Sequence, residues 1–241
     1  MYKRQEQHSV TFAAGLSLEG LKPVVAIYST FLQRGYDQFI HDVCLENIDV
    51  TFAIDRAGIV GEDGPTHTGS FDISFMRCIP NIVISCPSNE HELWHLLNIC
   101  YEYKGPAAIR YPRGSGIGVQ PIPNEVEGFE IGKAKKIKDG QSVCILNFGV
   151  LMDQIDQIAV KKDYTLYDMR FIKPIDQEAL EHAMQHETII TLEDNTLLGG
   201  CGSAVGEKLH KQKFRGNLLS IGLEDEFPAH GSRNEILKQN G

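Results

Sequence analysis

The chain has 241 residues, of which 42 % are hydrophobic and 23 % are charged, and its formal net charge is −9. This composition is typical of a globular protein with a buried core, and the length fits one large or two medium domains. The acidic balance argues against a nucleic-acid-binding face, which needs clustered basic residues. No apolar run approaches the ~20 residues that cross a bilayer, so we expect no membrane segment.

The N-terminus and the cysteines indicate a cytoplasmic protein. The basic residues Lys3 and Arg4 are followed by no apolar run, so we expect no secretory signal. The six cysteines are widely spaced, and none forms a C-x-x-C pair. We therefore expect reduced thiols in the core rather than disulfides or a zinc site.

The first half of the chain predicts helices that alternate with strands. Residues 6–20 predict a helix that ends at a glycine, and the residues from 32 to 43 carry apolar side chains at helical spacing. Buried strands are expected at residues 23–28, 50–54, 82–85 and 107–111. Ser88 is expected to cap a helix, whose inner face carries Leu93, Leu96, Leu97, Cys100 and Tyr101. Such alternation implies parallel pairing with right-handed crossovers.

The segment 112–128 interrupts this pattern with three prolines and four glycines. We interpret residues 116–130 as a linker between a first domain, 1–115, and a second domain, 131–241. Asp139-Gly140 lies between two strand-like runs and predicts a hairpin. Further strands are expected at 165–168, 188–192 and 218–221, and further helices at 177–185 and 203–211. The predicted fold class is α/β, with two α/β domains and mainly parallel sheets.

The loop from Asp55 to Gly69 is the best candidate for chemistry. It follows the strand at 50–54, and the ends of buried strands are where α/β proteins usually place functional residues. The loop brings a permanent cation, Arg56, near Asp63 and His67, which can exchange protons. A functional site and an ordinary loop are both compatible with this pattern.

Several other patterns allow a functional and a plain interpretation. Arg110 and Arg113, at the end of a strand, suit a phosphate or carboxylate ligand, with surface charge as an equal alternative. On residue patterns alone, Glu6 is a partner of the helix dipole, and Tyr28 and Phe31 belong to the core.

His91-Glu92-Leu93-Trp94-His95 matches the H-E-x-x-H motif of zinc proteases. A zinc site also needs a third protein ligand, which the sequence does not supply at the extended-motif spacing. We favour a solvated helix face and keep a zinc hydrolase through His91, Glu92 and His95 as an alternative. The run Gly199–Ser203 could hold an anion at a helix N-terminus, but it lacks the lysine of a P-loop, so tight packing is favoured.

Seven segments, taken in order, closely resemble sequences of the 1-deoxy-D-xylulose-5-phosphate synthase family. The members of this family are thiamine-diphosphate enzymes of the transketolase superfamily. The resemblance runs over nearly the whole chain from Glu6 onward. It implies a transketolase pyrimidine-binding domain followed by a transketolase C-terminal domain. The segments that carry it are Glu6-Gln7-His8, Ile27–Arg34, Asp55–Gly58, Asp63–His67, Arg110–Gly114, Asp168–Pro174 and Glu193–Asn195.

The resemblance implies an enzyme that joins pyruvate to D-glyceraldehyde 3-phosphate with loss of CO₂. This is the first step of non-mevalonate isoprenoid synthesis, and it also feeds thiamine and pyridoxal synthesis. The implied cofactors are thiamine diphosphate and Mg²⁺, and the implied assembly is a cytoplasmic homodimer. The sequence shows no match to the N-terminal domain that carries the Mg²⁺–diphosphate signature, so we expect a fragment that is inactive in isolation. A subunit of a split transketolase-like enzyme and a non-catalytic binding module remain alternatives.

The resemblance also implies roles for residues at the cofactor. Glu6 is expected to hydrogen-bond N1′ of the aminopyrimidine, Phe31 to stack on that ring, and Arg34 to lie beside them. Two departures from the family pattern stand out. Thr68 occupies a position where the family usually has glutamine, and the residues from 1 to 5 do not resemble the family.

At the substrates, the implied roles fall on five residues. Tyr28, Arg56 and Arg113 are expected to hold the phosphorylated acceptor, with the two arginines at its phosphate. Asp63 and His67 are expected to act on the carboxylate and in proton transfer to the new hydroxyl groups.

Overall fold

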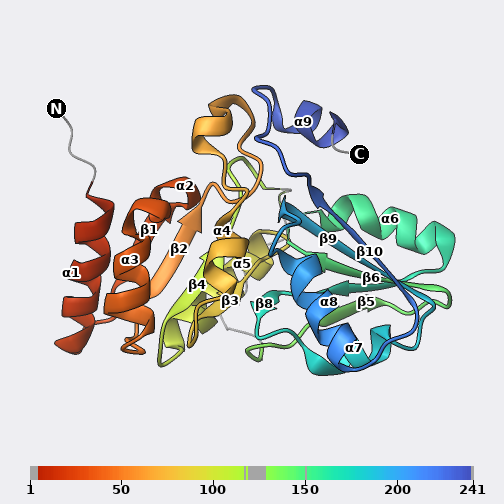
Figure 1. Cartoon of the computed structure of the whole chain (residues 1–241), viewed down its shortest axis with the longest axis horizontal. Coiled ribbons are helices and arrows are strands. Elements are labelled where there is room, and N and C mark those ends of the chain that lie inside the picture. The colour runs from red at the N-terminus through yellow and green to blue at the C-terminus, as the bar shows by residue number, and fades with distance from the viewer. Residues whose placement is uncertain (1–4, 117, 119–128, 150, 240–241) are drawn as a thin grey trace.

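A computed structural model describes residues 5–116, 118, 129–149 and 151–239. Two five-stranded sheets lie side by side, and helices flank each of them (Figure 1). This confirms the predicted α/β fold with mainly parallel sheets. Most of the predicted linker, 116–130, lies outside the described residues, as do residues 1–4, so the domain boundaries stay a prediction. Within the described part of the chain, no helix has the length and apolar character that a membrane crossing needs.

The first sheet has the strand order β1-β2-β4-β3-β8. Its first four strands pair in parallel and are β1 (Val24–Tyr28), β2 (Thr51–Asp55), β3 (Val83–Ser85) and β4 (Ala107–Arg110). The helices around them are α1 (Glu6–Leu18), α4 (Asp72–Arg77) and α5 (Glu90–Glu102). The inner strands β3 and β4 are buried along their whole length, as expected for strands covered on both faces.

The helix predicted from residue 32 is broken into short turns. They are α2 (Ser29–Leu32), the 3₁₀ turn η1 (Gln33–Gly35), α3 (Tyr36–Gln38) and the π-helical η2 (Phe39–Cys44). The predicted inward side chains Leu32, Phe39 and Val43 are nevertheless fully buried. The apolar period therefore identified the buried face but not the irregular backbone.

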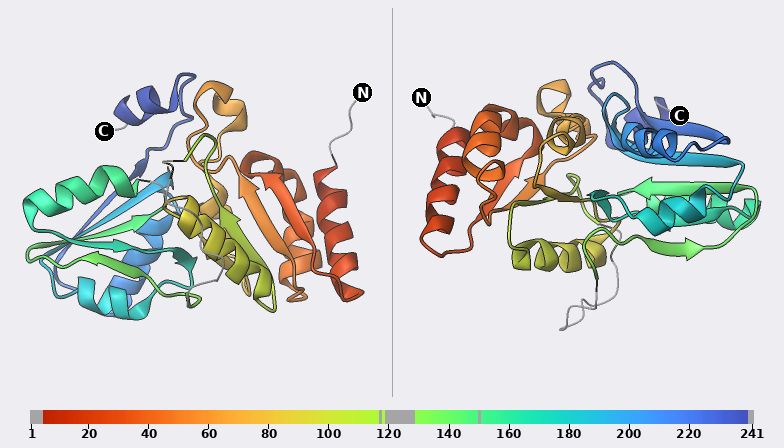
Figure 2. Two further views of the ribbon diagram at one scale, coloured as in Figure 1. Left: turned by 180° about the vertical axis from the view of Figure 1, so that it is seen from behind. Right: turned by 60° about the horizontal axis from the view of Figure 1, so that its bottom comes forward.

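The second sheet has the order β10-β9-β6-β7-β5. Its strands are β5 (Lys135–Lys138), β6 (Val143–Phe148), β7 (Thr165–Asp168), β9 (Thr188–Thr196) and β10 (Asn217–Leu223). The helices of this half are α6 (Met152–Lys162), α7 (Gln177–Ala183), α8 (Cys201–Lys211) and α9 (Arg233–Gln239). Helices α6 and α8 lie on opposite faces of the sheet (Figure 2).

The hairpin predicted at Asp139-Gly140 is wrong. Strand β5 pairs antiparallel with β7, because β6 already has parallel partners on both sides, β7 and β9. The turn packs against the residues that enter β7. The N–H of Gly140 donates to Oγ1 of Thr165 at 2.9 Å, and the N–H of Gln141 donates to the carbonyl oxygen of Asp163 at 3.0 Å. The chain therefore passes across β7 at this turn.

The cap predicted for α5 is also wrong. Asn89 is the N-cap residue, and its side chain accepts a hydrogen bond of 3.0 Å from the N–H of Glu92. The hydroxyl of Ser88 instead donates to Asp168 at the end of β7, at 2.5 Å. Because its hydroxyl donates to this buried carboxylate, Ser88 does not cap α5.

A strand from the second half of the chain completes the first sheet. Strand β8 (Phe171–Lys173) pairs antiparallel with β3, at the edge opposite β1. Phe171 and Ile172 are buried there, and the Nζ atom of Lys173 donates to the carbonyl oxygen of Arg77 at 3.2 Å. Backbone pairing thus joins the two halves of the molecule.

Candidate functional site

The loop after β2 is closed by a pair of glycines. Gly58 and Gly69 exchange two backbone hydrogen bonds of 2.9 Å. A side chain at Gly69 would collide with the carbonyl oxygen of Arg56, so only glycine permits this close approach. Between the glycines lie the 3₁₀ turns η3 (Gly61–Asp63) and η4 (Pro65–His67). The closed loop returns both turns to the carboxyl end of β2, where Arg56 lies.

Two arginines converge on one carboxylate in this loop. Arg56 adopts φ +57°, a left-handed conformation that is uncommon for any residue but glycine, and its guanidinium pairs with Asp63. The Nε atom of Arg113, which follows the neighbouring strand β4, lies 3.4 Å from the same carboxylate oxygen. Two cations therefore share one anion, which leaves positive charge for an anionic ligand to neutralise.

Aromatic rings lie directly beside these arginines. The guanidinium carbon of Arg56 is 4.3 Å from the ring centroid of Tyr28. Tyr28 stacks on Phe31 with centroids 5.0 Å apart, and Phe31 meets His67 edge-on at 5.6 Å. Arg34 lies over the Phe31 ring at 6.0 Å. Tyr28 and Phe31 are only half-buried, and Phe31 packs against the main core, so the two rings form an accessible aromatic platform at the edge of the core that residue patterns alone suggested.

Glu6 begins α1 near this group, but no described contact joins its side chain to it. Its carbonyl oxygen lies 3.3 Å from the position that a Cβ would take on Gly35, which places the start of α1 against the turn that follows Arg34. Figure 1 shows this end of α1 beside α2. Among the described residues, the half-buried carboxylate of Glu6 has no hydrogen bond or ion pair. The structure thus brings seven of the eight predicted residues into one chain of contacts and leaves the eighth nearby.

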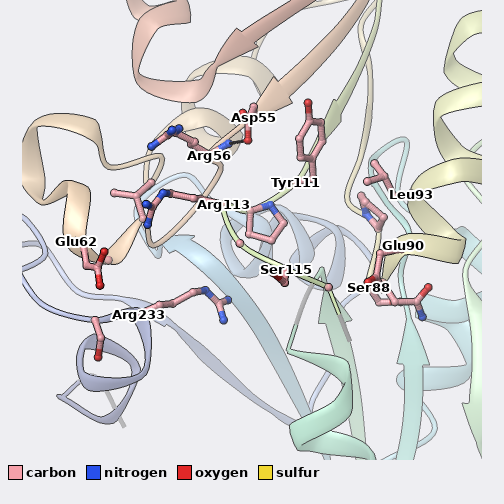
Figure 3. A pocket seen from close by; sticks show the side chains of 18 residues that line it. Asp55, Arg56, Glu62, Ser88, Glu90, Leu93, Tyr111, Arg113, Ser115 and Arg233 are labelled. Atoms are coloured by element: carbon pink, nitrogen blue, oxygen red, sulfur yellow. Dashed lines mark hydrogen bonds between the residues drawn. The ribbon is translucent and has the colours of Figure 1, made fainter. Parts of the chain in front are cut away.

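A cavity of about 760 Å³ opens beside the arginines (Figure 3). It is lined by the loop after β2, the start of α5, the segment after β4 and the start of α9. Arg56 and Arg113 belong to its wall, as does Tyr111, whose pKa is raised by burial. This size is typical of cavities that hold a small molecule.

Sequence reasoning did not predict the far wall of this cavity, which includes Glu90 and Arg233. Glu90 opens α5 and Arg233 opens α9, and neither residue belongs to a motif. Only the folded chain brings α9 against η3, where a Cβ on Gly61 would lie 2.9 Å from the backbone nitrogen of Arg233. No spacing or composition signal in the sequence reports that contact.

The interpretation of His91 and His95 as a solvated helix face is wrong. His95 is fully buried, its ring stacks on Phe129 with centroids 4.6 Å apart, and its Nε2 atom lies 3.1 Å from that of His91. Glu92 is also buried, and it accepts a hydrogen bond of 2.7 Å from Arg170. Phe129 and Arg170 come from a remote part of the chain. The sequence of α5 alone therefore could not predict that they bury His95 and Glu92.

The same arrangement gives the zinc alternative no support. The parts of the chain that the structure describes contain no group of three His, Cys, Asp or Glu residues that could hold a metal ion. The carboxylate of Glu92, which would be the general base of such a site, is paired with Arg170.

The predicted inner face of α5 is also wrong at Tyr101, whose side chain is exposed.

The glycine-rich start of α8 binds an anion of the protein itself. The carboxylate of Glu193 accepts hydrogen bonds from the N–H groups of Cys201 at 2.7 Å and Gly202 at 2.8 Å. Burial raises the pKa of Glu193 to about 7, against the lowering effect of these donors. The predicted tight packing is confirmed, and the helix terminus is occupied.

Two family models match the chain. Residues 5–117 match the model described as Transketolase, pyrimidine binding domain, and residues 132–241 match Transketolase, C-terminal domain. Together they span nearly the whole sequence.

Curated relatives carry a more specific name. The 1-deoxy-D-xylulose-5-phosphate synthases of Idiomarina loihiensis and Mannheimia succiniciproducens are each 55 % identical to the chain, over 98 % and 97 % of it. That of Francisella tularensis subsp. novicida is 53 % identical over 98 %. The chain spans 38 % of the length of each of these relatives.

Two solved structures share the fold. One is described as a split gene transketolase, inactive beta4 tetramer, with a TM-score of 0.85 and 25 % identity, over 98 % of this chain and 77 % of that one. The other is a transketolase from Campylobacter jejuni, with a TM-score of 0.75 and 18 % identity, over 98 % of this chain and 36 % of that one.

Proposed function

Because the chain belongs to the transketolase family, we propose that it supplies the pyrimidine-binding and acceptor-binding side of a 1-deoxy-D-xylulose-5-phosphate synthase. That enzyme joins pyruvate to D-glyceraldehyde 3-phosphate with loss of CO₂, and so begins non-mevalonate isoprenoid synthesis. The observation that carries the proposal is the convergence of Arg56 and Arg113 on Asp63, beside the stacked rings of Tyr28 and Phe31.

The arginines hold the phosphate of the acceptor. A phosphate dianion competes with Asp63 for the guanidinium groups of Arg56 and Arg113, because charge-assisted hydrogen bonds to phosphate are strong and often bidentate. Tyr28, which lies under the Arg56 guanidinium, keeps that group in place through a cation–π contact. The acceptor is thereby oriented with its carbonyl end toward the aromatic platform.

The residues present also fit the pyrimidine end of thiamine diphosphate, the cofactor on which the transketolase family depends. When bound, it supplies a nucleophilic thiazolium carbon. Phe31 offers a half-buried ring for stacking, with Arg34 beside it, and the buried hydroxyl of Ser29 has no hydrogen-bond partner among the described residues. Glu6 holds a proton at N1′ of the pyrimidine, since its carboxylate has no other described partner.

Asp63 and His67 move protons near the acceptor. The imidazole of His67 touches Phe31 edge-on, and its Nδ1 atom lies 2.9 Å from the hydroxyl of Thr66, which orients the ring. A histidine so placed can give a proton to a new hydroxyl oxygen and take it back. Asp63, once the phosphate replaces it at the arginines, is free to accept a hydrogen bond from the acceptor.

The proposal assigns Mg²⁺ and the diphosphate to residues outside the matched 38 % of the relatives. No metal-binding group of three side chains occurs in the described part of this chain.

We further propose a cytoplasmic homodimer. All six cysteines are free, as in proteins of reducing compartments, and large apolar side chains are exposed on α1 and β1.

The experiment compares three pure samples. They are the 241-residue chain alone, the chain mixed with the separately expressed N-terminal part of the Idiomarina loihiensis relative, and the two joined in one polypeptide. Each receives both substrates, thiamine diphosphate and Mg²⁺. We expect deoxyxylulose phosphate from the joined polypeptide and none from the chain alone. Turnover by the chain alone, or a folded but inactive joined polypeptide, would contradict the proposal.

A second candidate function is a subunit that works with a separate diphosphate-binding chain. The similarity to the split gene transketolase favours it, because the match spans most of both chains. Turnover in the mixed sample supports this candidate, whereas turnover only after joining supports a single continuous enzyme.

A further inference from the structure

A third arginine lines the cavity beside the candidate site. Arg233, the first residue of α9, shares the cavity wall with Arg56 and Arg113 although it comes from the second half of the chain. Figure 3 shows its side chain reaching from the α9 segment into the space below Arg113. The cavity is thus bounded by cations from both halves of the molecule.

The guanidinium of Arg233 lacks the partners that such a group needs. Its Nε and Nη2 atoms are shielded from solvent and have no hydrogen-bond partner among the described residues, where it also forms no ion pair. These two nitrogens lie on one edge of the guanidinium and match two oxygens of a phosphate or carboxylate. A shielded cation without a counter-ion is unfavourable, so an anion entering the cavity would stabilise it.

The backbone at Arg233 is held against the loop that carries Asp63. Gly61 has φ +67°, and a Cβ there would lie 2.9 Å from the Arg233 nitrogen, so the two segments are in direct contact. Close by, Ile59, Leu223 and Ile236 form a small buried cluster. The position of Arg233 is therefore fixed relative to Arg56 by backbone packing rather than by the side chain alone.

Carboxylates on the cavity wall do not neutralise Arg233. Asp55, Glu62 and Glu90 line the cavity, but none of them forms an ion pair with it. Asp55 accepts a hydrogen bond of 2.7 Å from the N–H of Arg56, and Glu90 accepts one of 3.1 Å from the N–H of Gly118. Since no described residue forms an ion pair with Arg233, its positive charge is available to a ligand.

We propose that Arg233 is a third phosphate-binding residue, which completes from the second half of the chain the anion site that Arg56 and Arg113 form. This inference rests on the proposed function, because it concerns the phosphate of the same acceptor. Three guanidinium groups around one cavity suit a phosphate monoester, a dianion with three terminal oxygens, whereas one arginine satisfies a monocarboxylate such as pyruvate.

The test measures the binding of inorganic phosphate and of D-glyceraldehyde 3-phosphate to the 241-residue chain by calorimetry. Pyruvate, which carries a carboxylate but no phosphate, is the comparison ligand. The variants are Arg233→Gln, Arg233→Lys and Arg113→Gln. Arg215→Gln is the matched control, because Arg215 is an exposed arginine of the same half of the chain, outside the cavity wall. Thermal unfolding of each variant checks that the fold is retained.

We expect Arg233→Gln to raise the dissociation constant of both phosphate ligands about tenfold or more, the usual effect of losing a charge-assisted hydrogen bond. Arg233→Lys should recover part of this loss, and Arg215→Gln should change nothing. If Arg233→Gln binds phosphate as the unmodified chain does while Arg113→Gln binds it more weakly, the inference is overturned and the proposed function still stands.

The inference is also overturned if Arg233→Gln weakens the binding of pyruvate only, or if the unmodified chain binds no phosphate. In both cases, turnover by the joined polypeptide tests the proposed function separately.

Discussion

Asp194, on β9 of the second sheet, accepts a hydrogen bond of 2.6 Å from Nη1 of Arg110, the last residue of β4 in the first sheet. Both side chains are almost completely buried, with exposed fractions of 2 % and 3 %. The Nε atom of Arg110 lies 3.1 Å from each carboxylate oxygen of Asp72. Arg113 follows on the same segment, so this ion pair anchors the segment that carries Arg113, an arginine that we propose binds phosphate.

Asp194→Ala should therefore destabilise the fold. Asp72 still neutralises Arg110 in this variant, but the buried Nη1 atom of Arg110 loses its acceptor, which lowers the free energy of unfolding by about 1–3 kcal/mol. Urea unfolding measures the change. The exposed Asp225→Ala is the control and should stay within about 0.5 kcal/mol of the unmodified chain. A similar loss in both variants would show that the buried pair adds nothing.

The buried Glu193 predicts a pH dependence of stability. Burial raises the pKa of its carboxyl to about 7, above its ordinary value near 4.5. Between these values the folded chain binds a proton that the unfolded chain has released, so stability falls as pH rises through this window. Glu193→Gln cannot titrate. Urea midpoints across the window should fall more steeply with pH for the unmodified chain than for the variant, while the exposed Glu226→Gln should keep the steep profile. Parallel profiles for all three proteins would refute this assignment.

Arg56→Ala and Arg113→Ala, made in the joined polypeptide, should weaken the phosphorylated substrate selectively. Each lost charge-assisted hydrogen bond costs roughly 1.5–3 kcal/mol of binding. Steady-state kinetics should show a higher KM for D-glyceraldehyde 3-phosphate and a smaller change for pyruvate, with Arg215→Ala unchanged. Equal effects on both substrates would argue against a phosphate role.

The exposed edge of the first sheet predicts self-association of the 241-residue chain. Strand β1 is the last strand at its edge, and Val24 is 48 % exposed there, while Phe12, Leu18 and Leu21 nearby are 57 %, 73 % and 57 % exposed. Exposed apolar patches and free strand edges favour association. Light scattering should show oligomers that the double variant Leu21→Lys, Val24→Lys reduces, but that Ile158→Lys on α6 does not. A monomer at all concentrations would contradict this prediction.

Much of the fold follows from local sequence patterns. The parallel strands β2, β3 and β4 appear as apolar runs, because strands buried on both faces must be nearly continuously apolar. The strand predicted at 23–28 exists as β1, but its predicted burial is wrong, because β1 lies at the sheet edge and alternate residues are exposed. Remote contacts explain the errors. Strand β8 joins a sheet whose other strands come from a much earlier part of the chain, and the turn after β5 crosses β7 before the chain enters β6.

The candidate site was predictable only in part. Arg56, Asp63 and His67 share a short loop, so their proximity follows from the sequence. The stack of Tyr28 on Phe31 does not, since aromatic residues at a strand end look like core residues, and the resemblance to a known family identified them instead. Arg233 was missed because only tertiary packing brings α9 to the cavity.

If Glu6 and its neighbours serve the pyrimidine end of thiamine diphosphate, the loss of the Glu6 carboxylate should stop the reaction while the fold is retained. Glu6→Gln in the joined polypeptide is compared with Glu19→Gln, an exposed glutamate just after the same helix. The measurement is the rate of deoxyxylulose phosphate formation at saturating cofactor and substrates. We predict that Glu6→Gln lowers the rate by ~10²–10⁴-fold, as expected for a lost proton relay, and that Glu19→Gln does not. A Glu6→Gln enzyme whose rate stays within a few-fold of the unmodified joined polypeptide would rule out this role for Glu6.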